Sequence, residues 1–130
     1  MTARSYKPES YNTVSPYLVV PDAAATIEFL KTIFSATELR RFPGPDGKRL
    51  MHAEVRIDDS IIMLGDACEG WPATPCHVHV YVADVDAVFQ SAIAAGAKPL
   101  QQPVKKEDED KRGGFQDPWG TSWWVATKVA

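Results

Sequence analysis

The sequence predicts an α+β fold built from two βαβββ modules whose strands form a curved mixed sheet around a cleft. Three observations lead to this prediction. Residues 15–29 (SPYLVVPDAAATIEF) and 77–91 (HVHVYVADVDAVFQS) repeat one pattern at an offset of about half the chain. In both copies an alternating pattern changes to a helical one directly after an aspartate, Asp22 or Asp84. Each helical stretch is then followed by three short strand candidates.

The first module is expected to begin with a strand at 15–20. Asp22 is expected to cap the following helix, because its side chain can accept hydrogen bonds from first-turn amides. Apolar side chains then recur at helical spacing up to Phe34. Three strands follow at 38–42, 49–57 and 60–64, separated by turn-forming Pro, Gly and Asp residues.

The second module is expected to repeat this order, with a strand at 77–82 and a helix that runs from the Asp84 cap to Gly96. The charged run 105–112 (KKEDEDKR) has no apolar residue and is expected to be a solvated loop, with a lid over the cleft as the alternative. The remaining strands are expected at 98–103, 114–116 and 122–127.

Length and composition bound the organisation of the chain. At 130 residues the prior is one domain, 1–130, with module one at about 13–67, a linker at about 68–75 and module two at about 76–128. A chain of this length buries roughly two thirds of its unfolded surface, so its core needs no disulfide or structural metal to be stable. Cys68 and Cys76 are expected to be free thiols.

Charge and hydropathy exclude several classes of partner. The 14 Lys and Arg residues against 17 Asp and Glu leave no basic field for nucleic acid or an anionic membrane. No apolar run approaches the roughly 20 residues of a membrane-spanning helix, and the polar N-terminus has no signal-peptide pattern. We expect a cytoplasmic protein.

The closing phrase DPWG at 117–120, followed by WWVAT at 123–127, completes a duplicated unit that resembles the vicinal oxygen chelate superfamily. This group includes glyoxalase I, bleomycin-resistance proteins and extradiol dioxygenases. Within it, MHAE at 51–54 and MLGD at 63–66 are most similar to the PhnB-like branch. The resemblance implies a cleft lined by the sheets, helices outside, and frequent dimers. It also implies, in metal-dependent members, four ligands from the first and last strands of both modules.

Those four positions fall on Ser15, Met63, His77 and Trp124, of which only His77 is a competent ligand. The usual metal site is therefore expected to be largely lost, and no cofactor is expected. A divalent metal held off the usual pattern by His52, Glu54, His77 and His79 is the alternative.

Strand periodicity indicates which side chains face the cleft. If Asp58 and Asp59 form a two-residue hairpin turn, Glu54 lies opposite Met63 and Arg56 opposite Ile61. All three histidines then share the cleft face. The candidate ligand-binding residues are Tyr17, His52, Glu54, Met63, His77, His79, Tyr81 and Trp124, and the candidate catalytic residues are His52, Glu54 and His77.

Three functions remain open on these residues. The leading hypothesis is a homodimeric protein of the glyoxalase and bleomycin-resistance type that binds a small apolar or aromatic molecule in its cleft. The second is a metal-dependent or metal-free lyase, isomerase or dioxygenase that uses His52, Glu54 and His77. The third is a dimeric structural module whose cleft is filled by its own side chains, with Trp124 as filling and His52–Glu54 as a structural pair.

Overall fold

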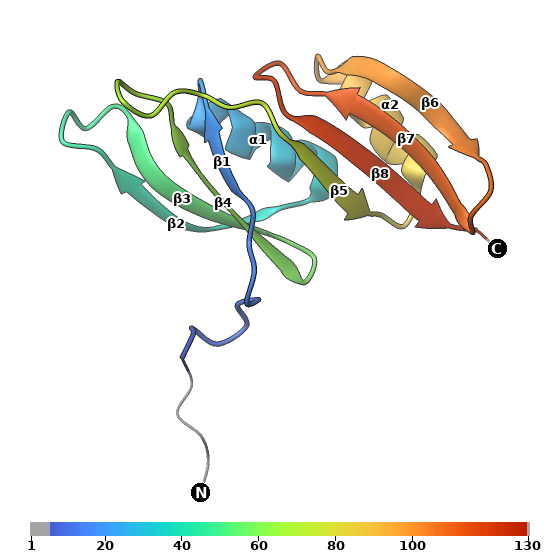
Figure 1. Cartoon of the computed structure of the whole chain (residues 1–130), viewed down its shortest axis with the longest axis horizontal. Coiled ribbons are helices and arrows are strands. Elements are labelled where there is room, and N and C mark those ends of the chain that lie inside the picture. The colour runs from blue at the N-terminus through green and yellow to red at the C-terminus, as the bar shows by residue number, and fades with distance from the viewer. Residues whose placement is uncertain (1–5, 130) are drawn as a thin grey trace, which may run out of the picture.

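Each half of the chain folds into a strand, a helix and three further strands, as Figure 1 shows for the computed structural model, which describes residues 6–129. Module one contains β1 (Tyr17–Val20), α1 (Ala23–Phe34), β2 (Thr37–Pro43), β3 (Leu50–Ile57) and β4 (Ser60–Asp66). Module two contains β5 (His77–Tyr81), α2 (Val85–Ala94), β6 (Lys98–Lys105), β7 (Asp110–Gln116) and β8 (Ser122–Lys128). The predicted α+β fold of two βαβββ modules is confirmed.

The two modules form sheets of equivalent topology. The strand orders are β1-β4-β3-β2 and β5-β8-β7-β6, and in each sheet the first strand pairs parallel with the last while the other pairs are antiparallel. The β3–β4 hairpin has the predicted register, with Glu54 opposite Met63 and Arg56 opposite Ile61. Asp58 makes this tight turn possible by adopting a left-handed φ of 53°.

Both helices begin at the predicted aspartates. Asp22 accepts a hydrogen bond from the Ala25 amide at 3.0 Å, and Asp84 accepts one from the Ala87 amide at 3.1 Å. Gly96 follows α2 with a φ of 103°, a conformation that glycine adopts without steric cost. Neither helix of the described chain has the length and apolar character needed to cross a membrane.

The helices lie on one side of the two sheets and leave the opposite sheet faces open (Figure 1). Apolar side chains on the helix side are buried in one core, with Trp123 and Phe115 fully inaccessible. The indole N–H of Trp123 donates to Asp117 Oδ2 at 2.9 Å, so the turn before β8 is fixed to the core. The alternation predicted for β5 is confirmed, because His77, His79 and Tyr81 are exposed on the open side.

The charged run 105–112 differs from the expected loop. Strand β6 extends to Lys105 and β7 begins at Asp110, whose Cα lies opposite that of Lys128 on β8. Asp110 is only 4% exposed because it accepts hydrogen bonds from Tyr81 and Arg112. The sequence predicted this strand only at 114–116, because the polar residues before Gly114 are satisfied by long-range partners and not by apolar packing.

Candidate functional site

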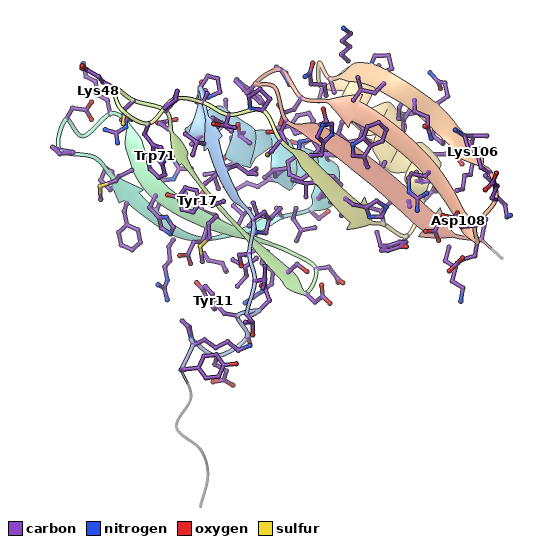
Figure 2. The ribbon with its side chains drawn as sticks, viewed as in Figure 1. Tyr11, Tyr17, Lys48, Trp71, Lys106 and Asp108 are labelled. Atoms are coloured by element: carbon purple, nitrogen blue, oxygen red, sulfur yellow. The ribbon has the colours of Figure 1, made fainter. Side chains whose placement is uncertain are left out.

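Four rings follow one another across the open face of module one, and we call this set the aromatic row: Phe42, His52, Tyr17 and Trp71. The ring centroids of Phe42 and His52 are 6.0 Å apart, those of His52 and Tyr17 5.5 Å, and those of Tyr17 and Trp71 5.5 Å. Phe42, Tyr17 and Trp71 are 46%, 39% and 41% exposed. Figure 2 shows Tyr17 and Trp71 over the module-one sheet. The row is an accessible surface on which a flat molecule can stack.

A chain of hydrogen bonds leads from the aromatic row to a buried carboxylate. Tyr17 Oη lies 3.1 Å from His52 Nδ1, and His52 Nε2 lies 2.7 Å from Glu54 Oε2. Glu54 is 4% exposed and also accepts a hydrogen bond from the Tyr11 hydroxyl, while Arg40 Nε lies 3.6 Å from its Oε1. An ionised Glu54 accepts from His52 Nε2–H, so His52 Nδ1 accepts from the Tyr17 hydroxyl when the imidazole is neutral.

The charge state of Glu54 follows from these partners. Burial alone would raise its pKa, but the hydrogen bonds from Tyr11 and His52, together with the charge of Arg40, bring the pKa below its usual value. The same contacts act in reverse on the phenols. The hydrogen bond to Glu54 raises the pKa of Tyr11, and burial followed by the charge of Glu54 raises the pKa of Tyr17. At neutral pH this hydrogen-bonded set therefore contains one ionised carboxylate, Glu54, and two neutral phenols, Tyr11 and Tyr17.

The segment before β1 is fixed against this open face. The Asn12 side-chain oxygen accepts from the Ile61 amide at 2.9 Å, and Arg56 donates to the Ser10 carbonyl at 3.4 Å. The Arg40 guanidinium lies 5.4 Å from the centre of the Tyr11 ring, a cation–π geometry. These contacts place the Tyr11 hydroxyl at Glu54.

On the open face of module two, Trp124 and His77 form a stacked pair. Their ring centroids are 6.2 Å apart with an interplanar angle of 17°, and Trp124 Nε1–H donates to His77 Nδ1 at 3.0 Å. The indole lies over Gly114 on β7, where a Cβ would stand 2.4 Å from two of its ring carbons. Gly114 is thus the residue that lets Trp124 lie against the sheet.

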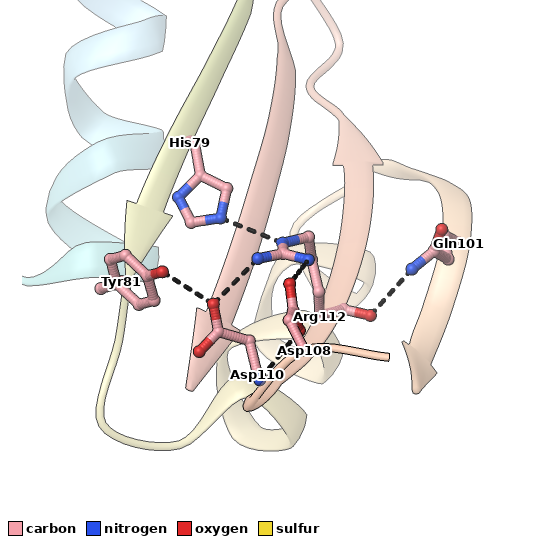
Figure 3. Close-up of polar contacts among 6 residues, drawn as sticks. All are labelled: His79, Tyr81, Gln101, Asp108, Asp110 and Arg112. Atoms are coloured by element: carbon pink, nitrogen blue, oxygen red, sulfur yellow. Dashed lines mark hydrogen bonds and ion pairs between the residues drawn. The ribbon is translucent and has the colours of Figure 1, made fainter. Parts of the chain in front are cut away.

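Arg112 connects the other polar groups of this face (Figure 3). Its Nε donates to His79 Nε2 at 3.1 Å, and its terminal nitrogens donate to Asp110 at 2.9 Å and Asp108 at 3.3 Å. The Tyr81 hydroxyl donates to the same Asp110 oxygen at 2.7 Å. Burial, followed by the charge of Arg112, lowers the pKa of His79, and the hydrogen bond to Asp110 raises the pKa of Tyr81. His79 is therefore neutral at physiological pH.

A groove of about 420 Å³ separates the β3–β4 hairpin from β5. His79 and Tyr81 line it on one side, and Ile57, Ser60 and Ile62 line it on the other. The aromatic row lies outside this groove. The open side of the molecule therefore offers an exposed stacking surface on module one and a partly enclosed space at the seam between the modules.

The predicted site residues fall into two groups, one on each sheet. Tyr17, Met63 and Glu54 lie on neighbouring strands in one row of the module-one sheet, with His52 bonded to Glu54. The group on module two consists of His77, His79, Tyr81 and Trp124. The described contacts do not join His77 to His52 or Glu54, so the three candidate catalytic residues do not form one cluster in the described chain.

Four residues of this face were not predicted: Tyr11, Phe42, Trp71 and Arg112. Phe42 could have been found from the β2 register, because it pairs with His52 on β3. Trp71 lies in the linker, where an isolated antiparallel β-bridge to Cys68 sets its position. No periodic pattern marks such a residue.

The model of the Glyoxalase/Bleomycin resistance protein/Dioxygenase superfamily matches residues 11–125. The chain belongs to this superfamily. An uncharacterised protein of Mycobacterium bovis is 42% identical over 127 residues, which cover 89% of this chain and 83% of that relative. An uncharacterised Mycobacterium tuberculosis protein of strain H37Rv is also 42% identical and covers 89% of this chain, with 74% of its own length matched.

Several solved structures share the fold at low sequence identity. TioX from Micromonospora sp. ML1 has a TM-score of 0.74 at 24% identity over 91% of this chain and 99% of its own. The fosfomycin resistance protein FosX from Listeria monocytogenes has a TM-score of 0.72 at 17% identity over 88% of this chain and 91% of its own. The PhnB protein from Bacillus cereus has a TM-score of 0.71 at 17% identity over 89% of this chain and 99% of its own.

The residues at the superfamily's metal positions do not fit a metal. Ser15, Met63 and Trp124 offer no carboxylate or imidazole. The remaining position, His77, has its Nδ1 lone pair engaged by the Trp124 indole, so its proton is on Nε2 and neither nitrogen offers a free lone pair. Within residues 6–129 no group of three or more His, Cys, Asp or Glu side chains is arranged to hold a metal ion.

Proposed function

We propose that this protein binds a flat aromatic or apolar small molecule on the open faces of its sheets, without a resident metal. The aromatic row is the observation that carries the proposal. Exposed aromatic side chains of this size in one continuous set are uncommon on a surface that only meets water. The buried carboxylate beneath the row fixes His52 and Tyr17 in place, so the stacking surface is organised before a ligand arrives.

A calorimetric titration tests this proposal with anthracene-2-sulfonate as the probe and cyclohexanesulfonate as its saturated control. We expect binding of the aromatic probe only. Replacing a ring by leucine keeps apolar bulk but removes stacking, so Trp71→Leu and Tyr17→Leu are each expected to weaken binding by about two- to tenfold. Tyr6→Leu is the matched control, because Tyr6 is 83% exposed and outside the aromatic row. Unchanged affinity in both row variants would contradict the proposal.

The hydrogen-bonded chain favours metal-free acid–base catalysis as a second candidate function. The Tyr17 hydroxyl, an imidazole and a buried carboxylate in series can move a proton to or from a bound molecule, with Glu54 stabilising the imidazolium that results. The test is deuterium exchange at the α-carbon of phenylacetone in D2O with EDTA present. Catalysis requires acceleration that Tyr17→Phe abolishes. If the wild-type protein gives no acceleration, this candidate is rejected for arylmethyl ketones.

Two finer assignments also stay proposals. We place the chain in the PhnB-like branch on its MHAE and MLGD motifs, in which His52 and Glu54 bond each other and Asp66 accepts from the Ala23 and Leu50 amides. We also propose a homodimer, because Tyr81 is 64% exposed on the open side. Sedimentation velocity tests this: twice the chain mass of 14.3 kDa is expected, and a monomer at all concentrations would contradict it.

A further inference from the structure

The two histidines of β5 are held in opposite tautomers by their neighbours. An indole N–H and a guanidinium can only donate hydrogen bonds. Trp124 Nε1 donates to His77 Nδ1 at 3.0 Å, so the His77 proton resides on Nε2. Arg112 Nε donates to His79 Nε2 at 3.1 Å, so the His79 proton resides on Nδ1. Each ring thereby has one nitrogen that accepts a hydrogen bond and one fixed tautomer.

The nitrogen that carries the proton is unengaged in both rings. Neither His77 Nε2 nor His79 Nδ1 has a hydrogen-bond partner among residues 6–129, although both side chains are exposed. The two residues are separated by one position on the same strand face, so their Cβ atoms are about 7 Å apart. The open face of module two therefore presents two N–H donors and no free imidazole lone pair.

We infer that His77 and His79 recognise the carbonyl oxygens of a flat aromatic ligand, as in a quinone. Carbonyl oxygens accept hydrogen bonds and carry no proton, which matches two fixed donors. The half-exposed Trp124, held flat over Gly114, supplies a stacking surface beside His77. His79 also lines the groove of about 420 Å³ at the seam between the modules, which offers room for the ligand. This inference adds a ligand class and the open face of module two to the proposed function, on which it rests.

The same contacts exclude other ligand classes from this pair of histidines. A metal ion needs an imidazole lone pair, and both are engaged by Trp124 and Arg112. A cationic ligand would be repelled, because both histidines present N–H groups and the positive charge of Arg112 lies next to His79. Acceptor groups on the ligand satisfy both donors without breaking a contact of the protein.

The tautomers can be measured without any ligand. Long-range ¹H–¹⁵N correlation spectra of the wild-type protein at pH 7.5 distinguish a proton on Nε2 from one on Nδ1, and the chain has only three histidines to assign. We expect His77 to carry its proton on Nε2 and His79 on Nδ1. Trp124→Phe keeps an aromatic ring but removes the donor, and should release His77 into a mixture of tautomers. His79 with its proton on Nε2 would overturn the inference.

Binding is then compared between anthraquinone-2-sulfonate and anthracene-2-sulfonate, which differ only in the two carbonyl groups. We expect the quinone to bind about fivefold or more tightly, because two hydrogen bonds are added. Trp124→Phe should reduce this preference more than the matched substitution Trp119→Phe, since Trp119 packs against Phe29 away from the histidines. Equal affinity for the two probes would overturn the inference and leave the proposed function standing. Binding of neither would overturn both.

Discussion

Replacement of Glu54 by glutamine is expected to destabilise the protein by about 2 kcal/mol at neutral pH. The carboxylate is 4% exposed and accepts hydrogen bonds from Tyr11 and His52. Hydrogen bonds to a charged group contribute roughly 1.5–3 kcal/mol, against about 0.5–1.5 kcal/mol for neutral pairs, so converting two of them costs about 1 kcal/mol each. The glutamine has nearly the same shape, which keeps cavity effects small.

Urea unfolding of both proteins at several pH values measures this difference. The folded-state pKa of Glu54 lies below its unfolded value, so the stabilisation is fully present above the ordinary glutamate pKa of about 4.3. It is lost as the pH falls through the folded-state pKa, and the two unfolding curves should converge there. Glu28→Gln is the control, because the Glu28 side chain is 67% exposed and should change stability by less than about 0.5 kcal/mol. Equal stability of wild type and Glu54→Gln at pH 7 would refute the reasoning.

Two further substitutions test the packing of module two. Gly114→Ala places a Cβ against the Trp124 ring and is expected to cost about 1–3 kcal/mol in urea unfolding, with a change in the tryptophan emission spectrum of the protein. Unchanged stability and emission would show that the ring is not held there. Asp84→Ala removes the cap of α2 and is expected to cost about 1 kcal/mol, more than Asp86→Ala, which keeps the cap and removes an exposed first-turn carboxylate paired with Lys111. The reverse order of the two Asp variants would contradict the capping role.

The fold could be predicted because the same local sequence patterns, helix caps and strand alternation, occur in both modules. The caps at Asp22 and Asp84 and the alternation of β5 each depend on neighbours within a few residues of the chain. The hairpin register followed from one turn at Asp58. At Asp110 these local rules had no apolar residue to act on, so β7 was predicted to begin at Gly114 and not at Asp110. The hydrogen-bond partners of Asp110 are Tyr81 and Arg112, which the local pattern does not reveal.

The sequence predicted which side chains lie on the open sheet faces, but it did not predict which residues contact them. Period two placed Tyr17 and His52 on the open side, yet it carries no information about what covers Glu54. Tyr11 reaches Glu54 across 43 positions of the chain, and Trp71 reaches Tyr17 from an irregular linker. Such contacts depend on the path of non-periodic segments, which a single sequence does not specify.

Chemical-shift mapping with anthracene-2-sulfonate tests the claim that the open faces bind a flat aromatic molecule. Amide ¹H–¹⁵N spectra recorded during a titration should show the largest shifts in β1, in β3 around His52 and in the linker around Trp71, where ring currents of a stacked ligand act. The amides of α1 and α2, which lie behind the sheets, should remain unchanged (Figure 1). Shifts concentrated on the helices, or no saturable shift at all, would contradict the account.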